Sequence, residues 1–317
     1  MAQRVPEYGP RLERFTYPFA VKFLPLTIAG ERAEMAFMDV QPQRPNGRTA
    51  VLLHGKNFCG ATWGGTARTL AARGYRVIIP DQIGFCKSSK PAATQYSFAM
   101  MADATRRLLA AQGVTHASVL GHSMGGMLAM RYAIMFPDKV DRLVLVNPLG
   151  LRDRTEDGAL YRDVDTLFAN ERETSAERIR AYQLANYYHG QWRPAYDKWV
   201  TMLAGMSAGK GRDQVALAQA KTSEMILTQP VAHELGRIKS PTTLIVGTLD
   251  RTAFARAQVP QTLREFLKPI PQVAETAVKR FPDARLVKLD GLGHAPQVED
   301  PARFERALLT ALGERTS

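Results

Sequence analysis

The stretch Gly121-His122-Ser123-Met124-Gly125 decides the fold of this chain. It has the pattern G-x-S-x-G, and the apolar run 117–120 before it predicts a short buried strand. Residues 124–136 after it predict a helix, which Pro137 ends. A strand, a tight turn with small neighbours and a helix are typical of a nucleophile elbow, in which Ser123 stands exposed at the carboxyl end of a strand. The alternative is a glycine-rich turn that holds an ordinary serine.

Short apolar runs alternate with helical patterns on both sides of this stretch. Further strands are expected at 50–53, 77–81, 143–147, 242–247 and 285–289, and helices at 66–73, 96–112 and 301–312. Ser97 is the expected N-cap of the helix 96–112. Residues 21–28 and 33–40 predict two antiparallel strands at a sheet edge. This order favours an α/β fold with a mainly parallel central sheet that helices cover on both faces.

The alternation breaks between residues 150 and 235, where helical segments follow one another without a convincing buried strand. We interpret 150–235 as a helical cap inserted into a core made of 1–149 and 236–317. Aromatic residues crowd one part of this insertion, at Tyr182, Tyr187, Tyr188, Trp192, Tyr196 and Trp199. These side chains either line an apolar pocket or pack the insertion onto the core.

Composition bounds the environment and the partners. The chain has 317 residues, 45% of them hydrophobic, and no apolar run approaches the ~18 residues of a membrane span. Residues 1–20 lack the apolar region of a secretory signal, so we expect a cytoplasmic protein, or a periplasmic one if the N-terminus has been trimmed. The net charge of +12 is spread along the chain, which favours a basic surface over a nucleic-acid site.

The two cysteines, Cys59 and Cys86, fall in segments that we place near the mouth of the site. A bridge between them is geometrically possible. We expect two free thiols instead, because a chain of this size needs no disulfide to be stable. Cys86 is interpreted as a packing residue, since no second histidine is evidently placed to activate it.

A serine hydroxyl needs a base to take its proton, and the base needs an acid to orient it. His294 is the best base, because it lies in a glycine-rich loop after the last predicted strand, at the same sheet edge as Ser123. Asp250 follows the strand 242–247 and is the preferred acid. Asp290 lies nearer to His294 in sequence and is the competing acid. The side chain of His122 is expected to point away from the nucleophile.

The loop His54-Gly55-Lys56-Asn57 follows the predicted strand 50–53. We expect the backbone N–H of Lys56 and that of Met124 to form an oxyanion hole, with Asn57 or Phe58 as the alternative to Lys56. His54 is expected to brace the loop and Asp81 to anchor the next one. Asn57, Phe58 and Trp192 are candidates for the substrate pocket.

The chain lacks the common metal and nucleotide patterns. It has no H-E-x-x-H, no paired C-x-x-C, no acidic calcium loop, no G-x-G-x-x-G and no P-loop. We therefore expect no metal and no cofactor.

Gly121 to Gly125, His54-Gly55, Asp250 and Gly293-His294 together resemble the α/β-hydrolase fold superfamily, with the insertion in the place of that fold's cap. The resemblance implies a serine hydrolase. Ser123 argues against haloalkane dehalogenases and epoxide hydrolases, which resemble this chain but use an aspartate there. Relatives often carry glycine where this chain has Cys86, which puts the shape of that loop in question.

We expect a carboxylic ester hydrolase that acts on a small ester-like molecule through Ser123, His294 and Asp250. The alternatives on the same triad are hydrolysis of an amide, lactone or carbon–carbon bond, or acyl transfer. A different class of alternative is a ligand-binding protein that keeps the hydrolase scaffold and turns nothing over.

Overall fold

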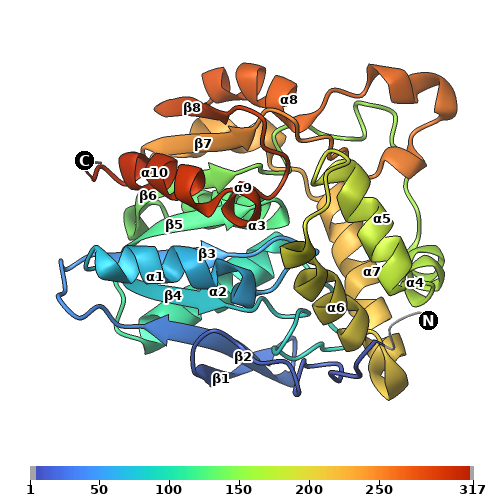
Figure 1. The fold of residues 1–317 in the computed structure, drawn as a ribbon, viewed down its shortest axis with the longest axis horizontal. Coiled ribbons are helices and arrows are strands. Elements are labelled where there is room, and N and C mark those ends of the chain that lie inside the picture. Colours follow the sequence, from blue (N-terminus) through green and yellow to red (C-terminus); the bar gives the residue numbers. More distant parts are fainter. Residues whose placement is uncertain (1–4, 315–317) are drawn as a thin grey trace.

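The computed structural model describes residues 5–314, and an eight-stranded sheet forms its centre (Figure 1). The strands lie in the order β1-β2-β4-β3-β5-β6-β7-β8. Their bounds are β1 Val21–Ile28, β2 Glu31–Val40, β3 Thr49–Leu53, β4 Arg76–Pro80, β5 Ala117–His122, β6 Val140–Val146, β7 Thr242–Gly247 and β8 Ala284–Leu289. β1 pairs with β2, and β2 with β4, in the antiparallel sense, and all other pairs are parallel. The predicted α/β fold and its antiparallel edge are confirmed.

Helices cover both faces of the sheet, as the apolar strand runs predicted. α1 (Gly64–Ala72) and α10 (Pro301–Ala311) lie on one face, where Leu70 and Phe304 belong to the same core cluster as Leu52. α2 (Phe98–Ala111), α3 (Met124–Met135) and α8 (Ile270–Ala277) lie on the other face, where Leu128 packs with Val51 in a second cluster. The short helix α9 (Pro296–Glu299) precedes α10. Successive strand residues therefore serve opposite clusters, because side chains alternate across a strand.

Four helices fill the long connection between β6 and β7. They are α4 (Val164–Arg172), α5 (Ala176–Asn186), α6 (Asp197–Met206) and α7 (Arg212–Thr228). Figure 1 shows them gathered at the end of the sheet where the parallel strands finish. Of the six aromatic side chains noted in this insertion, Tyr188, Trp192 and Tyr196 pack on one another, with the rings of Tyr188 and Tyr196 stacked at 3.8 Å. The division of the chain into a core and a cap of residues 150–235 stays a prediction. Among the described residues, no helix is long and apolar enough to cross a membrane.

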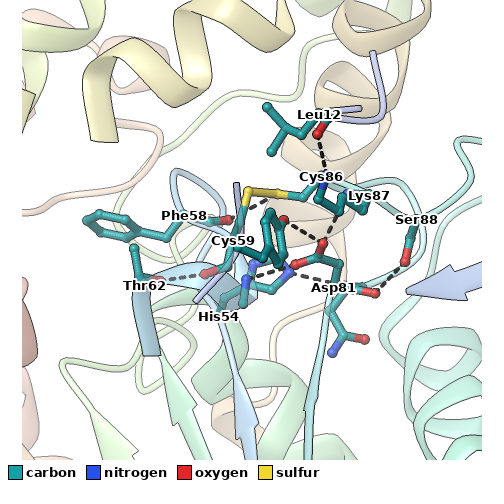
Figure 2. Close-up of a disulfide and its surroundings, with 12 residues drawn as sticks. Leu12, His54, Phe58, Cys59, Thr62, Asp81, Cys86, Lys87 and Ser88 are labelled. Carbon is teal, nitrogen blue, oxygen red and sulfur yellow. Dashed lines mark hydrogen bonds between the residues drawn. A yellow bond between two sulfur atoms is a disulfide. The ribbon is translucent and has the colours of Figure 1, made fainter. Parts of the chain in front are cut away.

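Cys59 and Cys86 form a disulfide, so the expectation of two free thiols was wrong (Figure 2). The cysteines lie in the loops that follow the neighbouring strands β3 and β4, and their Cα atoms are 5.9 Å apart, within the range of ordinary disulfides. Asp81 holds both loops in place, because its carboxylate accepts hydrogen bonds from the backbone N–H of Gly60 at 2.8 Å and of Lys87 at 3.0 Å. The expectation rested on the argument that a chain of this size is stable without a disulfide. Whether two cysteines pair depends instead on whether their loops bring the sulfur atoms together.

Candidate active site

Ser123 lies at the sharp turn between β5 and α3, with φ 55° and ψ −120°. A non-glycine residue in this region is strained, and such strain occurs at functional turns. The turn needs its glycines, because a Cβ on Gly121 would lie 2.1 Å from the Gly125 carbonyl oxygen. A Cβ on Gly125 would lie 2.4 Å from the Leu53 carbonyl oxygen. These contacts bring the start of α3 against β3 and fix the position of Ser123. Ser123 was expected to stand exposed, but it is only 4% exposed.

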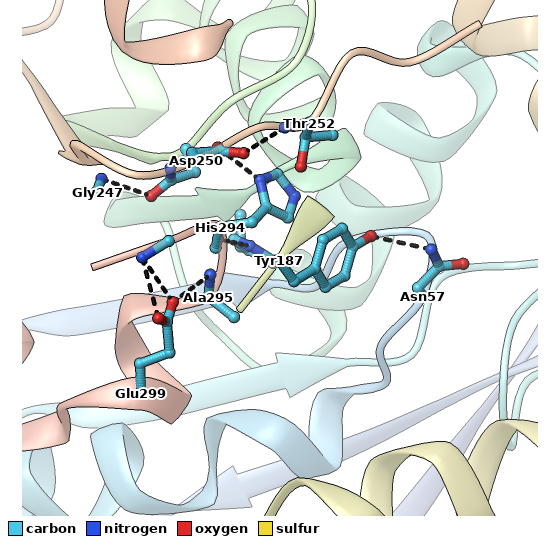
Figure 3. A network of polar contacts seen from close by, with 11 residues as sticks. Asn57, Tyr187, Gly247, Asp250, Thr252, His294, Ala295 and Glu299 are labelled. Carbon is cyan, nitrogen blue, oxygen red and sulfur yellow. Dashed lines mark hydrogen bonds and ion pairs between the residues drawn. The ribbon is translucent and has the colours of Figure 1, made fainter. Parts of the chain in front are cut away.

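His294 and Asp250 meet at the carboxyl edge of the sheet, on the turns after β8 and β7 (Figure 3). His294 Nδ1 lies 2.7 Å from Asp250 Oδ2, and both side chains are buried. His294 Nε2 is buried and has no hydrogen-bond partner among residues 5–314. The competing acid, Asp290, is exposed. The sequence therefore selected the carboxylate that contacts this histidine.

His122 connects the turn that holds Ser123 to the loop that holds His294. Its Nε2 donates a hydrogen bond to the His294 carbonyl oxygen at 2.8 Å, and the two imidazole rings are 4.9 Å apart. Burial lowers the pKa of His122 well below its ordinary value, so the ring is neutral. This side chain braces the site and leaves Nε2 of His294 free.

Two positions that sequence reasoning missed hold the Asp250–His294 pair. Asn147 follows β6 with φ 40° and donates a hydrogen bond from Nδ2 to Asp250 Oδ2 at 2.6 Å. Glu299 in α9 accepts hydrogen bonds from the backbone N–H groups of Gly293 and Ala295, at 3.0 Å and 3.2 Å, on either side of the histidine. Asn147 ends a predicted strand at the same edge of the sheet, and that placement was the available signal. Glu299 gave no signal, since its contacts depend on the fold of its loop.

The loop after β3 lies against Ser123. A Cβ on Gly55 would lie 3.0 Å from the Ser123 Cβ. His54 donates from Nδ1 to the Gly55 carbonyl at 2.9 Å and accepts the Gln82 N–H at Nε2, so it braces the loop as expected. Burial lowers the pKa of His54 and keeps it neutral. Met124 is the first residue of α3, where backbone N–H groups have no partner within the helix.

A family model described as the alpha/beta hydrolase fold matches residues 50–301. The chain belongs to the α/β-hydrolase family. The solved structure of a probable hydrolytic enzyme from Pseudomonas aeruginosa PAO1 is 51% identical, with a TM-score of 0.96, over 99% of this chain and 100% of that one. The 2-hydroxy-6-oxo-6-phenylhexa-2,4-dienoate hydrolase of Burkholderia cepacia is 28% identical over 84% of this chain and 88% of that protein. Lipase 1 of Psychrobacter immobilis is 28% identical over 80% of this chain and 73% of that protein. These relatives support hydrolase activity for this chain.

A cavity of about 610 Å³ opens above Ser123 in this α/β-hydrolase, between the core and the four inserted helices. Lys56 and Asn57 line it with Ser123, together with Tyr182 and Tyr187 from the insertion. Asn57 Nδ2 donates to Tyr187 Oη at 2.9 Å (Figure 3). Lys56 Nζ pairs with Glu171 of α4 at 2.7 Å, which joins the loop to the insertion. The volume is that of a site for a small molecule.

Two of the predicted pocket residues lie elsewhere. Phe58 is buried under the loop, where its ring packs against those of His122 and Tyr187, and it is not part of the cavity wall. Trp192 is also absent from that wall, because its ring packs on Tyr188 and its Nε1 donates to Asp197. The aromatic residue type alone could not predict which side chains line the cavity and which pack against other side chains, because both kinds occur within the same stretch of the insertion.

Proposed function

We propose that this α/β-hydrolase is a serine hydrolase that cleaves carboxylic esters through Ser123, His294 and Asp250. The observation that carries the proposal is the buried contact of 2.7 Å between His294 Nδ1 and Asp250 Oδ2, at the edge of the sheet where Ser123 lies in a strained elbow and lines a cavity. A buried acid that accepts the Nδ1 proton orients the ring and stabilises the imidazolium, and Nε2 then serves as the base.

In this mechanism Ser123 Oγ attacks the ester carbonyl carbon while its proton moves to His294 Nε2. The backbone N–H groups of Lys56 and Met124 bind the oxyanion that develops. Collapse of the tetrahedral intermediate breaks the ester bond, and His294 gives its proton to the departing alcohol. A water molecule, whose proton moves to His294 Nε2, then attacks the acyl carbon. Collapse of this second intermediate breaks the bond to Ser123 Oγ, which takes the proton back from His294 as the carboxylic acid leaves. Residues 150–235 act as the cap that shields these steps from bulk water.

Labelling with a fluorophosphonate probe, followed by peptide mapping, tests the proposal. We expect label on Ser123 in the wild type and none in Ser123→Ala, with ester turnover lower by roughly 10⁴-fold or more. Ser240→Ala is the matched control, because Ser240 is a buried serine before β7 whose hydroxyl has no partner among residues 5–314. Label elsewhere, or full turnover by Ser123→Ala, would refute the mechanism.

Hydrolysis of a carbon–carbon bond is the second candidate function. The Burkholderia cepacia relative and the 2-hydroxymuconate semialdehyde hydrolase of Pseudomonas putida, 26% identical over 84% of this chain, favour it by their names. The test compares two rates of this enzyme: cleavage of a dienoate substrate, followed by its loss of absorbance, and hydrolysis of p-nitrophenyl esters. A kcat/KM for the dienoate that exceeds that of every ester would replace the ester proposal with this one.

A further inference from the structure

The wall of the cavity above Ser123 carries an excess of positive charge. One carboxylate lines it, that of Glu171, and this group is already paired with Lys56. The remaining cationic side chains of the wall are Arg162, Arg178, Arg256 and Arg264. None of these four lies within 4.0 Å of a carboxylate among the residues that the structure describes. The cavity is therefore suited to a ligand with negative charge.

Three of these side chains form one group, the arginine cluster of Arg162, Arg256 and Arg264. Arg162 Nη2 donates to the Ala257 carbonyl at 3.2 Å, Arg256 Nη1 to the Arg264 carbonyl at 2.8 Å, and Arg264 Nε to the Val259 carbonyl at 2.8 Å. Backbone carbonyls orient a guanidinium without neutralising it, and each guanidinium keeps further N–H groups. The cluster joins the stretch before α4 to the stretch between β7 and α8, which is orange in Figure 1.

A second observation in the same wall points to a polar ligand. Gln183 of α5 is fully buried, and neither its amide nitrogen nor its amide oxygen has a partner among residues 5–314. Thr252 and Gln219 also belong to the wall, and Thr252 Oγ1 and Gln219 Nε2 are likewise buried without a hydrogen-bond partner among residues 5–314. A buried polar group without a partner carries a desolvation cost, because it has lost its hydrogen bonds to water. A substrate that pairs with these groups removes that cost, whereas a purely hydrocarbon chain does not.

We propose that the natural substrate carries an anionic group, a carboxylate or a phosphate, away from the bond that is cleaved, and that the arginine cluster binds this group. The planar guanidinium fork matches the oxygens of either anion and forms charge-assisted hydrogen bonds with them. The polar part of the substrate between this anion and the ester meets Gln183. This inference rests on the proposed function for its reaction and on the wall of the cavity for its substrate.

The test compares paired esters of equal acyl length. One series consists of p-nitrophenyl monoesters of dicarboxylic acids from four to eight carbons, and the neutral series of the corresponding monocarboxylic esters. A third series ends in a phosphonate and separates phosphate from carboxylate recognition. A fourth pair, 4-acetoxybenzoate and phenyl acetate, places the anion on the leaving group. We expect kcat/KM at least tenfold higher for the anion in at least one matched pair, and a smaller preference at high salt.

The arginine cluster is then replaced by Arg162→Gln, Arg256→Gln and Arg264→Gln in one variant, with folding checked by thermal melting. We expect the anion preference to fall to unity or below through a rise in KM. Arg306→Gln on α10, an exposed arginine outside the cavity, is the control and keeps the preference. A wild type that cleaves neutral esters and never prefers an anion overturns the inference and leaves the proposed function standing.

A binding measurement keeps the inference testable if no ester is cleaved and Ser123 is not labelled, the outcome that would refute the proposed function. Free adipate, suberate and inorganic phosphate are titrated against the protein in a thermal-shift assay. A rise in melting temperature that the cluster variant lacks supports the anion site. Equal responses of wild type and cluster variant to all three anions overturn it.

Discussion

Reducing the bond between Cys59 and Cys86 should destabilise the protein by an amount that follows from the loop it closes. The cysteines are 27 residues apart, and the chain-entropy model gives such a loop about 12 cal/mol/K, or about 3.5 kcal/mol at 25 °C. The entropy of unfolding grows with chain length, so 317 residues correspond to about 1.5 °C per kcal/mol, and the melting temperature should fall by about 5 °C. Both side chains are buried, so their packing also contributes.

Thermal melting with and without a phosphine reductant measures this effect, and the double variant Cys59→Ala/Cys86→Ala is the comparison. The reductant should lower the melting temperature of the wild type and leave that of the variant unchanged. Titration of the denatured, unreduced wild type should find no free thiol. Two titratable thiols, or equal melting temperatures in both conditions, would refute the disulfide and the loop argument together.

Three further perturbations test the contacts around the site. Gly125→Ala should destabilise the fold by about 1–3 kcal/mol in urea unfolding and abolish fluorophosphonate labelling, because its Cβ would lie 2.4 Å from a β3 carbonyl oxygen. Gly236→Ala is the control, because a Cβ there has no contact closer than 3.7 Å. Burial raises the pKa of Glu299 to about 7, so the folded state holds an extra proton between pH about 4.5 and 7, and stability falls as the pH rises through that window. In Glu299→Gln the urea midpoint should lose this dependence on pH, and an unchanged dependence would contradict the assignment to Glu299. Lys56→Met and Glu171→Gln should show a coupling free energy of about 0.5–1 kcal/mol in a double-mutant cycle, and additive effects would mean that the pair contributes nothing.

The sequence predicted the elements whose pattern is local. The helix observed as α2 has Ser97 as its N-cap, whose hydroxyl accepts the Met100 N–H at 3.0 Å, as the residue type indicated. The long stretch between Asp250 and His294, interrupted by Pro260, Pro269 and Pro271, predicted an extra element without its type or bounds, and α8 lies in this stretch. Proline is tolerated in the first turn of a helix, and that is where Pro271 lies.

Site residues were predictable where chain order and strand ends decide their positions. Ser123, Asp250 and His294 each follow a parallel strand, so one rule places all three at the same edge. The disulfide, the role of Asn147 and the exclusion of Trp192 from the cavity depend on how loops and helices from distant parts of the chain pack. That information lies in three-dimensional contacts, which a local pattern does not carry.

The contacts around Tyr187 indicate how the insertion is attached to the site. His294 N–H donates to the Tyr187 carbonyl at 2.9 Å, and the two rings lie 4.4 Å apart. A Cβ on Gly293 would lie 1.8 Å from that same carbonyl oxygen, so this close approach requires glycine. Displacing the end of α5 would therefore disturb the loop that orients His294. On the side of α4 the insertion is joined to the loop after β3 by the ion pair of Lys56 with Glu171, a contact between two partly exposed side chains that contributes less than the buried contacts of Tyr187.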